Sequence, residues 1–199
     1  MFRLLIPLIF LTVSQFCFSE EFNLKEVSLT LDDDAILIAR AKNIHSSALT
    51  IDAHADIEIP GKPSSYVGSD GLSKVSPKKM RAGGLDAVVM SIAVGPMPRN
   101  SDGYAKARSL AQTKLAAVKT LAADTNNNTV IVLSTKDLDT AHRDGKSSLL
   151  LGFQNALILG TDVNVIDTLY NSGVRVFALT HMGHNNFADS SRTLFDGKT

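Results

Sequence analysis

The chain contains no tryptophan and a single cysteine, Cys17, among its 199 residues. One cysteine cannot form an intramolecular disulfide, and the chain beyond Cys17 has no thiolate to act as a nucleophile or a metal ligand. Any metal bound by this chain must therefore be held by histidine, carboxylate or neutral oxygen donors.

A net charge of either sign is also absent. Twenty basic and 20 acidic residues give a formal net charge of zero, and the sequence pI is about 7.0. This balance gives no indication of a nucleic acid or an anionic surface as a partner. Hydrophobic residues make up 44% of the chain, which suffices for one ordinary core and excludes a disordered chain.

A hydrophobic run long enough to span a bilayer comfortably is missing as well. The apolar run at residues 4–13 follows Arg3 and precedes small residues suited to cleavage after Ser19, which is the layout of a signal peptide over residues 1–19. An uncleaved anchor is the alternative. We expect an exported protein, periplasmic or secreted, with no stable membrane span after signal removal and one domain over residues 20–199.

Several well-defined catalytic motifs do not occur. The sequence has neither Gly-x-Gly-x-x-Gly nor Gly-x4-Gly-Lys, so nothing supports a nucleotide-binding sheet. It also lacks the Gly-x-Ser-x-Gly elbow of serine hydrolases and the His-Glu-x-x-His helix of zincins. His45 and His142 fall at the ends of predicted helices, where we expect them to interact with carbonyl groups rather than with a metal.

Apolar runs rich in Val, Ile and Leu alternate along the chain with helical patterns. The pattern predicts strands at residues 48–56, 85–94, 129–133, 148–153 and 174–180, and helices at 35–45, 101–123, 137–143 and 161–171. A loop rich in Gly, Ser and Pro follows the first strand at residues 60–77. Regular alternation of this kind favours a parallel sheet covered by helices on both faces.

The first predicted strand ends in His54 and Asp56, which lie two residues apart. Because side chains in a strand alternate between faces, both should project from the same face at the carboxyl end. Gln154 and His181 end two later strands, and in an α/β barrel these ends converge on one site. His54 and Asp56 are suitable ligands for a divalent metal such as zinc; alternatively, Asp56 caps a loop and His54 is an ordinary polar residue.

Four segments, in order, resemble the membrane (renal) dipeptidase family, the M19 metallopeptidases. They are Ile-Asp-Ala-His-Ala-Asp at 51–56, Arg-Ala-Gly-Gly at 81–84, Gly-Phe-Gln-Asn at 152–155, and Leu-Thr-His followed by Asn-Asn-Phe-Ala-Asp-Ser at 179–190. The resemblance extends from about residue 30 to the end of the chain.

This resemblance implies a TIM-barrel-like (β/α)8 metal-dependent hydrolase with two zinc ions, which cleaves dipeptides by means of a metal-activated water. By motif, His54 and Asp56 bind the first zinc, Gln154 occupies the position that bridges both metals, and His181 contacts the substrate. The partner is then a small peptide, not a nucleic acid, and the resemblance also suggests a homodimer.

Two departures from the family pattern modify these expectations. The bridging residue is normally glutamate, whereas the carboxamide of Gln154 offers one neutral oxygen, so we expect a weak second zinc or a mononuclear site. In addition, a (β/α)8 barrel needs about 250 residues, so we expect an amino-terminal part with about five βα units, inactive alone. Two alternatives are another metal-dependent amidohydrolase on the same barrel and a non-catalytic binding protein that has lost the bridging carboxylate.

Overall fold

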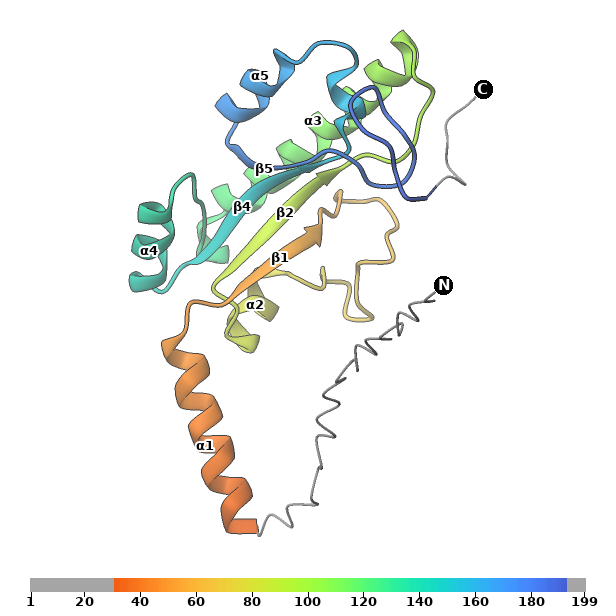
Figure 1. Cartoon of the computed structure of the whole chain (residues 1–199). Helices are drawn as coiled ribbons and strands as arrows, with labels where there is room; N and C mark the ends of the chain where they lie inside the picture. The colour runs from red at the N-terminus through yellow and green to blue at the C-terminus, as the bar shows by residue number, and fades with distance from the viewer. Residues whose placement is uncertain (1–30, 193–199) are drawn as a thin grey trace, which may run out of the picture. The chain divides into compact units, whose positions relative to one another are not determined.

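The computed structural model describes residues 31–192, in which helices and strands alternate along the chain (Figure 1). The helices are α1 (Leu31–Ser47), α2 (Pro77–Gly83), α3 (Ser101–Ala123), α4 (Thr135–Arg143) and α5 (Val165–Asn171). The strands are β1 (Ile51–Asp56), β2 (Ala87–Ala93), β3 (Thr129–Ile131), β4 (Ser147–Gln154) and β5 (Val174–Ala178). Single 3-10 turns follow α3 at Thr125–Asn127 and β4 at Ala156–Leu159.

The five strands form one parallel sheet, which confirms the predicted α/β barrel-like class. β2 pairs with β1 on one side and with β4 along seven residues on the other. β3 pairs with the first residues of β4 and β5 with its last four, so both lie on the edge of β4 that faces away from β2. β3 is therefore not inserted between β2 and β4, which pair with each other directly.

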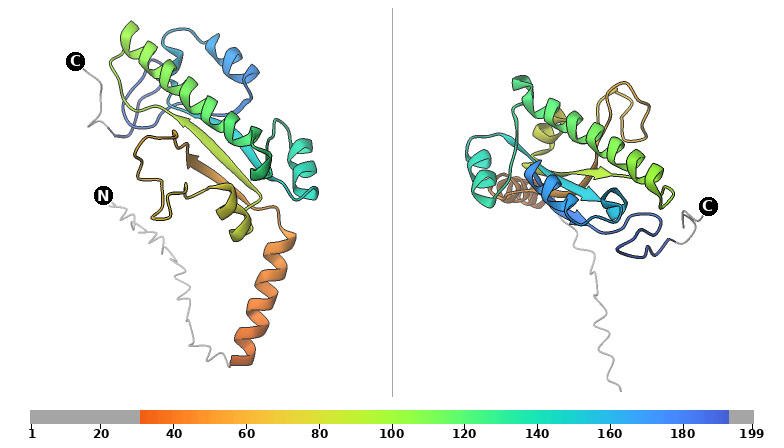
Figure 2. Two further views of the ribbon diagram at one scale, coloured as in Figure 1. Left: turned by 180° about the vertical axis from the view of Figure 1, so that it is seen from behind. Right: turned by 90° about the horizontal axis from the view of Figure 1, so that it is seen from above.

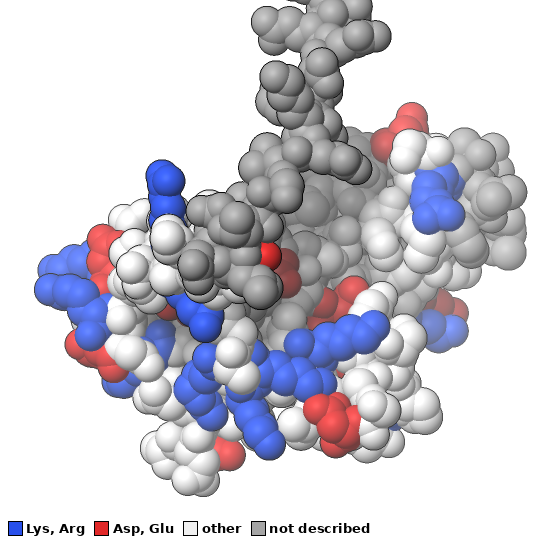
Figure 3. All heavy atoms as spheres, turned by 90° about the horizontal axis from the view of Figure 1, so that it is seen from below, with Lys and Arg blue, Asp and Glu red and all other residues white. Residues whose placement is uncertain are grey.

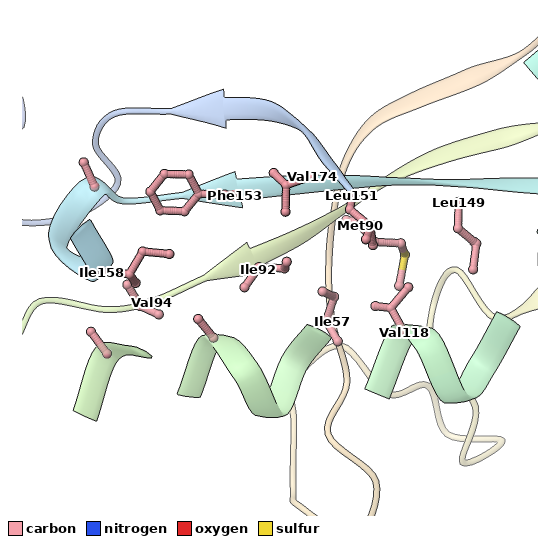
Figure 4. Packing of buried hydrophobic residues seen from close by; sticks show 14 of the residues in the cluster. Ile57, Met90, Ile92, Val94, Val118, Leu149, Leu151, Phe153, Ile158 and Val174 are labelled. Atoms are coloured by element: carbon pink, nitrogen blue, oxygen red, sulfur yellow. The ribbon is translucent and has the colours of Figure 1, made fainter. Parts of the chain in front are cut away.

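One face of the sheet packs against α3, which runs across it in Figure 2. The residues of α3 that are buried are Gly103, Ala107, Ala111 and Val118. They are one or two helical turns apart and form a narrow stripe of small residues, which lets the helix lie close to the strands. Figure 4 shows the strand residues opposite, among them Met90, Ile92, Leu151 and Phe153. Burial of each larger aliphatic side chain contributes about 1.5–3 kcal/mol to the free energy of folding, so this layer contributes much of the stability of the sheet.

The opposite face of the sheet carries the polar strand residues. Asp56, Ser91 and Gly152 lie side by side in register across β1, β2 and β4, and Gln154 follows two residues farther along β4. Register partners and residues two apart share a face, so Gln154 lies on the same face as Asp56. Gly152 is required here because a Cβ atom would lie 2.8 Å from Cγ1 of Val89.

Residues 1–30 and 193–199, at the two ends of the chain, lie outside the described residues. The expected signal peptide at residues 1–19 falls in this part and stays a prediction. Within residues 31–192, no helix combines the length and the apolar character that a membrane crossing requires. On the face drawn in Figure 3, basic side chains gather toward the middle, with acidic side chains scattered around them.

The amino end of the sheet is held by Asp86, which lies directly before β2. One carboxylate oxygen accepts hydrogen bonds from the backbone N–H and the hydroxyl of Thr50, both at 2.8 Å. The other lies 3.2 Å from Nδ1 of His142 in α4. Burial alone would raise the pKa of Asp86, but the bonds from Thr50 and the neighbouring His142 outweigh it and hold the pKa below its ordinary value. His142, in the last turn of α4, thus lies beside a carboxylate, and an interaction of its ring with carbonyl groups stays a prediction.

Replacing Asp86 with asparagine is expected to lower the free energy of unfolding at pH 7 by about 1–2 kcal/mol, the usual worth of charge-assisted hydrogen bonds. Because the pKa of Asp86 is lowered in the folded state, its contribution is present above the ordinary pKa of about 3.9 and is lost as the pH falls through the folded value. Urea unfolding at pH 7 and at lower pH measures the difference, which should shrink on acidification. Asp139→Asn on the exposed surface of α4 is the control, and an equal effect of both variants would refute the assignment.

Candidate metal and substrate site

His54 and Asp56 come together at the carboxyl end of β1. Nε2 of His54 lies 3.9 Å from Oδ2 of Asp56, and the two side chains are 47% and 19% exposed. Ala55 between them points into the core, at 7% exposure. The backbone N–H of His54 donates to Oδ1 of Asp52 at 3.0 Å, where the pairing of β1 with β2 shifts register. The local backbone thus presents an imidazole and a carboxylate on the same side, as the spacing predicts.

A cavity of about 300 Å³ adjoins this pair, lined by β1 and by the loop that follows it. The phenol of Tyr66, from that loop, lies near Asp56, and interaction with this carboxylate raises the pKa of the phenol, with a further contribution from the charge of Glu58. Lys74 and Ser73 complete the loop side of the cavity. A hydroxyl at this position can donate a hydrogen bond to the carboxylate of Asp56 and so orient the oxygen that would coordinate a metal. Tyr66 was not identified from the sequence, where it stands ten residues beyond Asp56 in a loop without a motif.

Replacing Tyr66 with phenylalanine is expected to weaken metal binding at Asp56 about tenfold, the lower end of the usual effect of losing a hydrogen bond to a metal ligand. Chelator competition with zinc and with cobalt measures the change. Tyr170→Phe in α5, an exposed tyrosine, is the matched control. Unchanged affinity in Tyr66→Phe would mean that the hydrogen bond does not orient Asp56.

Gln154 ends β4 on the same face of the sheet. Its Oε1 atom is buried and has no hydrogen-bond partner among the described residues. A buried acceptor without a partner is costly and rare, so this oxygen is suited to accept a hydrogen bond or to coordinate a cation. Its register partner on β2 is Ala93, whose methyl group offers no competing donor.

The donor set of the described residues suits a divalent cation. It consists of one imidazole, one carboxylate and one buried amide oxygen, which are accepted ligand types for zinc or another hydrolytic metal. No group of three or more His, Cys, Asp or Glu side chains in residues 31–192 has the arrangement of a metal site. The candidate site therefore depends on the neutral Gln154 or on further ligands and water to complete its coordination.

Two buried asparagines fix the strand ends around Gln154. Nδ2 of Asn155 donates to the carbonyl oxygen of Val94 at 3.0 Å, and its Oδ1 accepts from Leu157 N at 3.1 Å and from Asn185 Nδ2 at 3.2 Å. Asn185 also donates to the carbonyl oxygen of Leu179 at 2.7 Å. Asn155 adopts a φ of 84°, which is unusual for a residue other than glycine. The pair thus joins the segments that follow β2, β4 and β5.

His181 lies in the segment after β5, at the same edge of the sheet, with an exposed side chain. Its carbonyl oxygen accepts a 2.8 Å hydrogen bond from the hydroxyl of Ser190. Nδ1 of His184 lies 3.0 Å from a carboxylate oxygen of Asp189. The structure thus places His181 where the sequence predicts, and its contact with a substrate stays a prediction.

The family model described as membrane dipeptidase (peptidase family M19) matches residues 38–198. No curated protein matches the chain. Among solved structures, the probable dipeptidase PvdM from Pseudomonas aeruginosa superposes with a TM-score of 0.69 at 24% identity, covering 79% of this chain and 41% of that one.

Two further solved structures share the fold. An amidohydrolase from Pseudomonas aeruginosa gives a TM-score of 0.56 at 19% identity, with 74% of this chain and 38% of that chain covered. The dipeptidase AC, a metallopeptidase of family M19, gives 0.55 at 16% identity, with 66% and 42% covered. The chain thus spans less than half the length of each of these proteins.

Proposed function

Since the chain belongs to the membrane dipeptidase family, peptidase family M19, we propose that the protein is a zinc-dependent dipeptidase. The observation that carries this proposal is the joint placement of His54, Asp56 and the buried oxygen of Gln154 on one face and at one edge of the sheet. We also propose that the protein is exported, because residues 1–19 have the layout of a signal peptide.

In this proposal His54 and Asp56 hold one zinc ion. When bound, zinc polarises the scissile carbonyl and lowers the pKa of a bound water toward neutrality. In the same proposal Tyr66, which lies near Asp56, donates a hydrogen bond to this carboxylate and so holds it in one orientation. His181, exposed after β5, contacts the substrate, and the adjacent 300 Å³ cavity has room for one residue of a dipeptide.

Gln154 takes the position that bridges the two metals. A carboxylate can bind two cations through two anionic oxygens, whereas the carboxamide has one neutral oxygen and an NH2 group that repels a cation. The second zinc ion is therefore held more weakly than the first.

Replacing Gln154 with glutamate in the full-length protein tests this position. Glutamate adds one negative charge to the ligand set, so the second zinc should bind at least about tenfold more tightly than in the wild type. If glutamine is a functioning variant of the bridging ligand, turnover of dipeptides should change by less than about tenfold. Metal titration and hydrolysis of a dipeptide panel provide the two measurements. Gln154→Asn, which shortens the side chain, is the matched control and should bind no more zinc than the wild type.

A non-catalytic binding protein is the second candidate, and the neutral Gln154 is the observation that favours it. In that case Gln154→Glu should raise turnover from near zero by orders of magnitude. Stable binding of two zinc ions without turnover of any dipeptide would instead point to an amidohydrolase that acts on a different amide or ester.

A further inference from the structure

The loop that follows β1 contains a short hairpin over residues 66–74. Val67 and Ser73 form an antiparallel bridge, and the backbone N–H of Lys74 donates to the carbonyl oxygen of Tyr66 at 2.9 Å. The two arms of this hairpin are thus fixed against each other by the backbone, although the sequence shows no motif there.

The tip of the hairpin is attached to α2. Nζ of Lys79, in α2, donates to Oδ1 of Asp70 at 2.9 Å and to the carbonyl oxygen of Leu72 at 3.3 Å. The same carboxylate oxygen accepts a hydrogen bond from the backbone N–H of Leu72 at 3.1 Å. The bond from Lys79 also holds the pKa of Asp70 below its ordinary value. The hairpin is therefore held at its tip as well as along its arms.

The hairpin brings two polar side chains to the candidate metal site. Tyr66 and Lys74 stand on either side of the bridge, directly opposite each other, so their side chains lie on the same side of the hairpin. Both line the cavity of about 300 Å³ that His54 and Asp56 also line. A phenol and an ammonium group thus accompany the two candidate ligands.

Lys74 is the one lysine or arginine among the described residues that line this cavity. Its side chain is exposed, and within residues 31–192 its ammonium group is in neither an ion pair nor a hydrogen bond. Lys79, by contrast, is bound to Asp70. An ammonium group in this position is suited to bind a carboxylate of a ligand that enters the cavity.

A peptide can offer two kinds of carboxylate to Lys74. The terminal carboxylate of a dipeptide lies at a nearly constant distance from the scissile carbonyl, so its partner must be held rigidly beside the metal. The carboxylate of an acidic side chain lies at a distance that differs between aspartate and glutamate. Lysine has a compact charge on a flexible four-carbon stem, and Lys74 extends it from a loop, which suits the second kind.

We propose that Lys74 binds the side-chain carboxylate of an aspartate or glutamate residue in the substrate and so makes the protein selective for acidic peptides. This inference rests on the proposed peptidase function and adds to it a preference for one kind of side chain. Lys74 thereby determines specificity and takes no part in the cleavage itself.

Hydrolysis of matched dipeptides by the zinc-loaded, full-length protein tests the proposal. Alanyl-glutamate is compared with alanyl-glutamine and alanyl-lysine, and glutamyl-alanine with glutaminyl-alanine and lysyl-alanine, so that each position of the dipeptide is probed. At one of the two positions the wild type should favour the acidic over the neutral peptide about tenfold in kcat/KM, because one charge-assisted contact is added. The ratio between peptides does not depend on the zinc content of the preparation.

Two variants connect this preference with Lys74. Lys74→Gln should abolish the preference, and Lys74→Glu should reverse it in favour of the lysine-containing peptide. Lys62→Glu, at an exposed position of the same loop outside the cavity lining, is the matched control and should keep the wild-type ratio. Circular dichroism checks folding of each variant.

Calorimetric titration of the metal-free protein with the same peptides separates this proposal from the peptidase proposal, because no peptide is cleaved. Tighter binding of the acidic peptide that is lost in Lys74→Gln, without hydrolysis when zinc is added, would refute the dipeptidase and keep the role of Lys74. Equal affinity and equal kcat/KM for acidic and neutral peptides would overturn that role, even in an active dipeptidase. A preference unchanged in Lys74→Glu would overturn it too, and the absence of both binding and hydrolysis would refute both proposals.

Discussion

Replacing Asp56 with asparagine is expected to abolish zinc binding at the end of β1 and to reduce dipeptide turnover by about a thousandfold or more. The change keeps the size of the side chain but removes the one anionic ligand that β1 supplies beside His54, 3.9 Å away. A thousandfold loss corresponds to about 4 kcal/mol of transition-state stabilisation. Zinc content by mass spectrometry and hydrolysis of a dipeptide panel measure the two effects.

The control for this variant is Asp139→Asn, which removes the same charge from the exposed surface of α4. It should keep both zinc and turnover, so that a general effect of net charge is excluded. An Asp56→Asn protein that is folded, carries zinc and turns over dipeptides at the wild-type rate would show that Asp56 is a loop-capping residue and not a metal ligand.

Replacing Asn155 with alanine is expected to lower the free energy of unfolding by about 3 kcal/mol or more. Alanine loses the hydrogen bonds that Asn155 makes to Val94 and Leu157. The loss leaves buried backbone groups unpaired, at about 1–3 kcal/mol each. Alanine also keeps a Cβ atom at a φ of 84°, so the backbone strain of asparagine at this position is retained without the hydrogen bonds that offset it. Urea unfolding of the two proteins measures the difference.

Asn155→Gly separates the two contributions. Glycine loses the same hydrogen bonds but adopts a positive φ without strain, so it should be more stable than the alanine variant although its side chain is smaller. If the alanine variant has a free energy of unfolding equal to or higher than that of the glycine variant, the role assigned to the backbone conformation is contradicted.

The order and type of most elements follow from the sequence, and the clearest cases are β2 and β4, which are buried apolar runs. The short helix α2 at Pro77–Gly83 was not among the predicted helices. The boundaries are less predictable. A helix was expected from residue 161, yet α5 begins at Val165, because Oδ1 of Asp162 accepts a hydrogen bond from Asn164 N at 2.9 Å and closes a turn there. The place of β3 at the edge of β4 also depends on contacts between distant residues, which the pattern of one chain does not contain.

The residues of the candidate site were also predictable only in part. His54 and Asp56 could be paired because a strand repeats every two residues, and Gln154 because parallel strands end at one edge. Tyr66 could not, since it stands ten positions after Asp56 in a loop without a motif. The contact between Asn155 and Asn185 spans 30 residues.

Zinc content and dipeptide hydrolysis of the full-length protein, purified without residues 1–19, test the proposed peptidase most directly. We expect at least one zinc per chain, with turnover that is lost on chelation and restored by added zinc. A second, weaker zinc would show that Gln154 can serve in a binuclear site. A folded protein that binds no zinc and hydrolyses no member of a dipeptide panel would contradict the proposal and leave the binding-protein alternative.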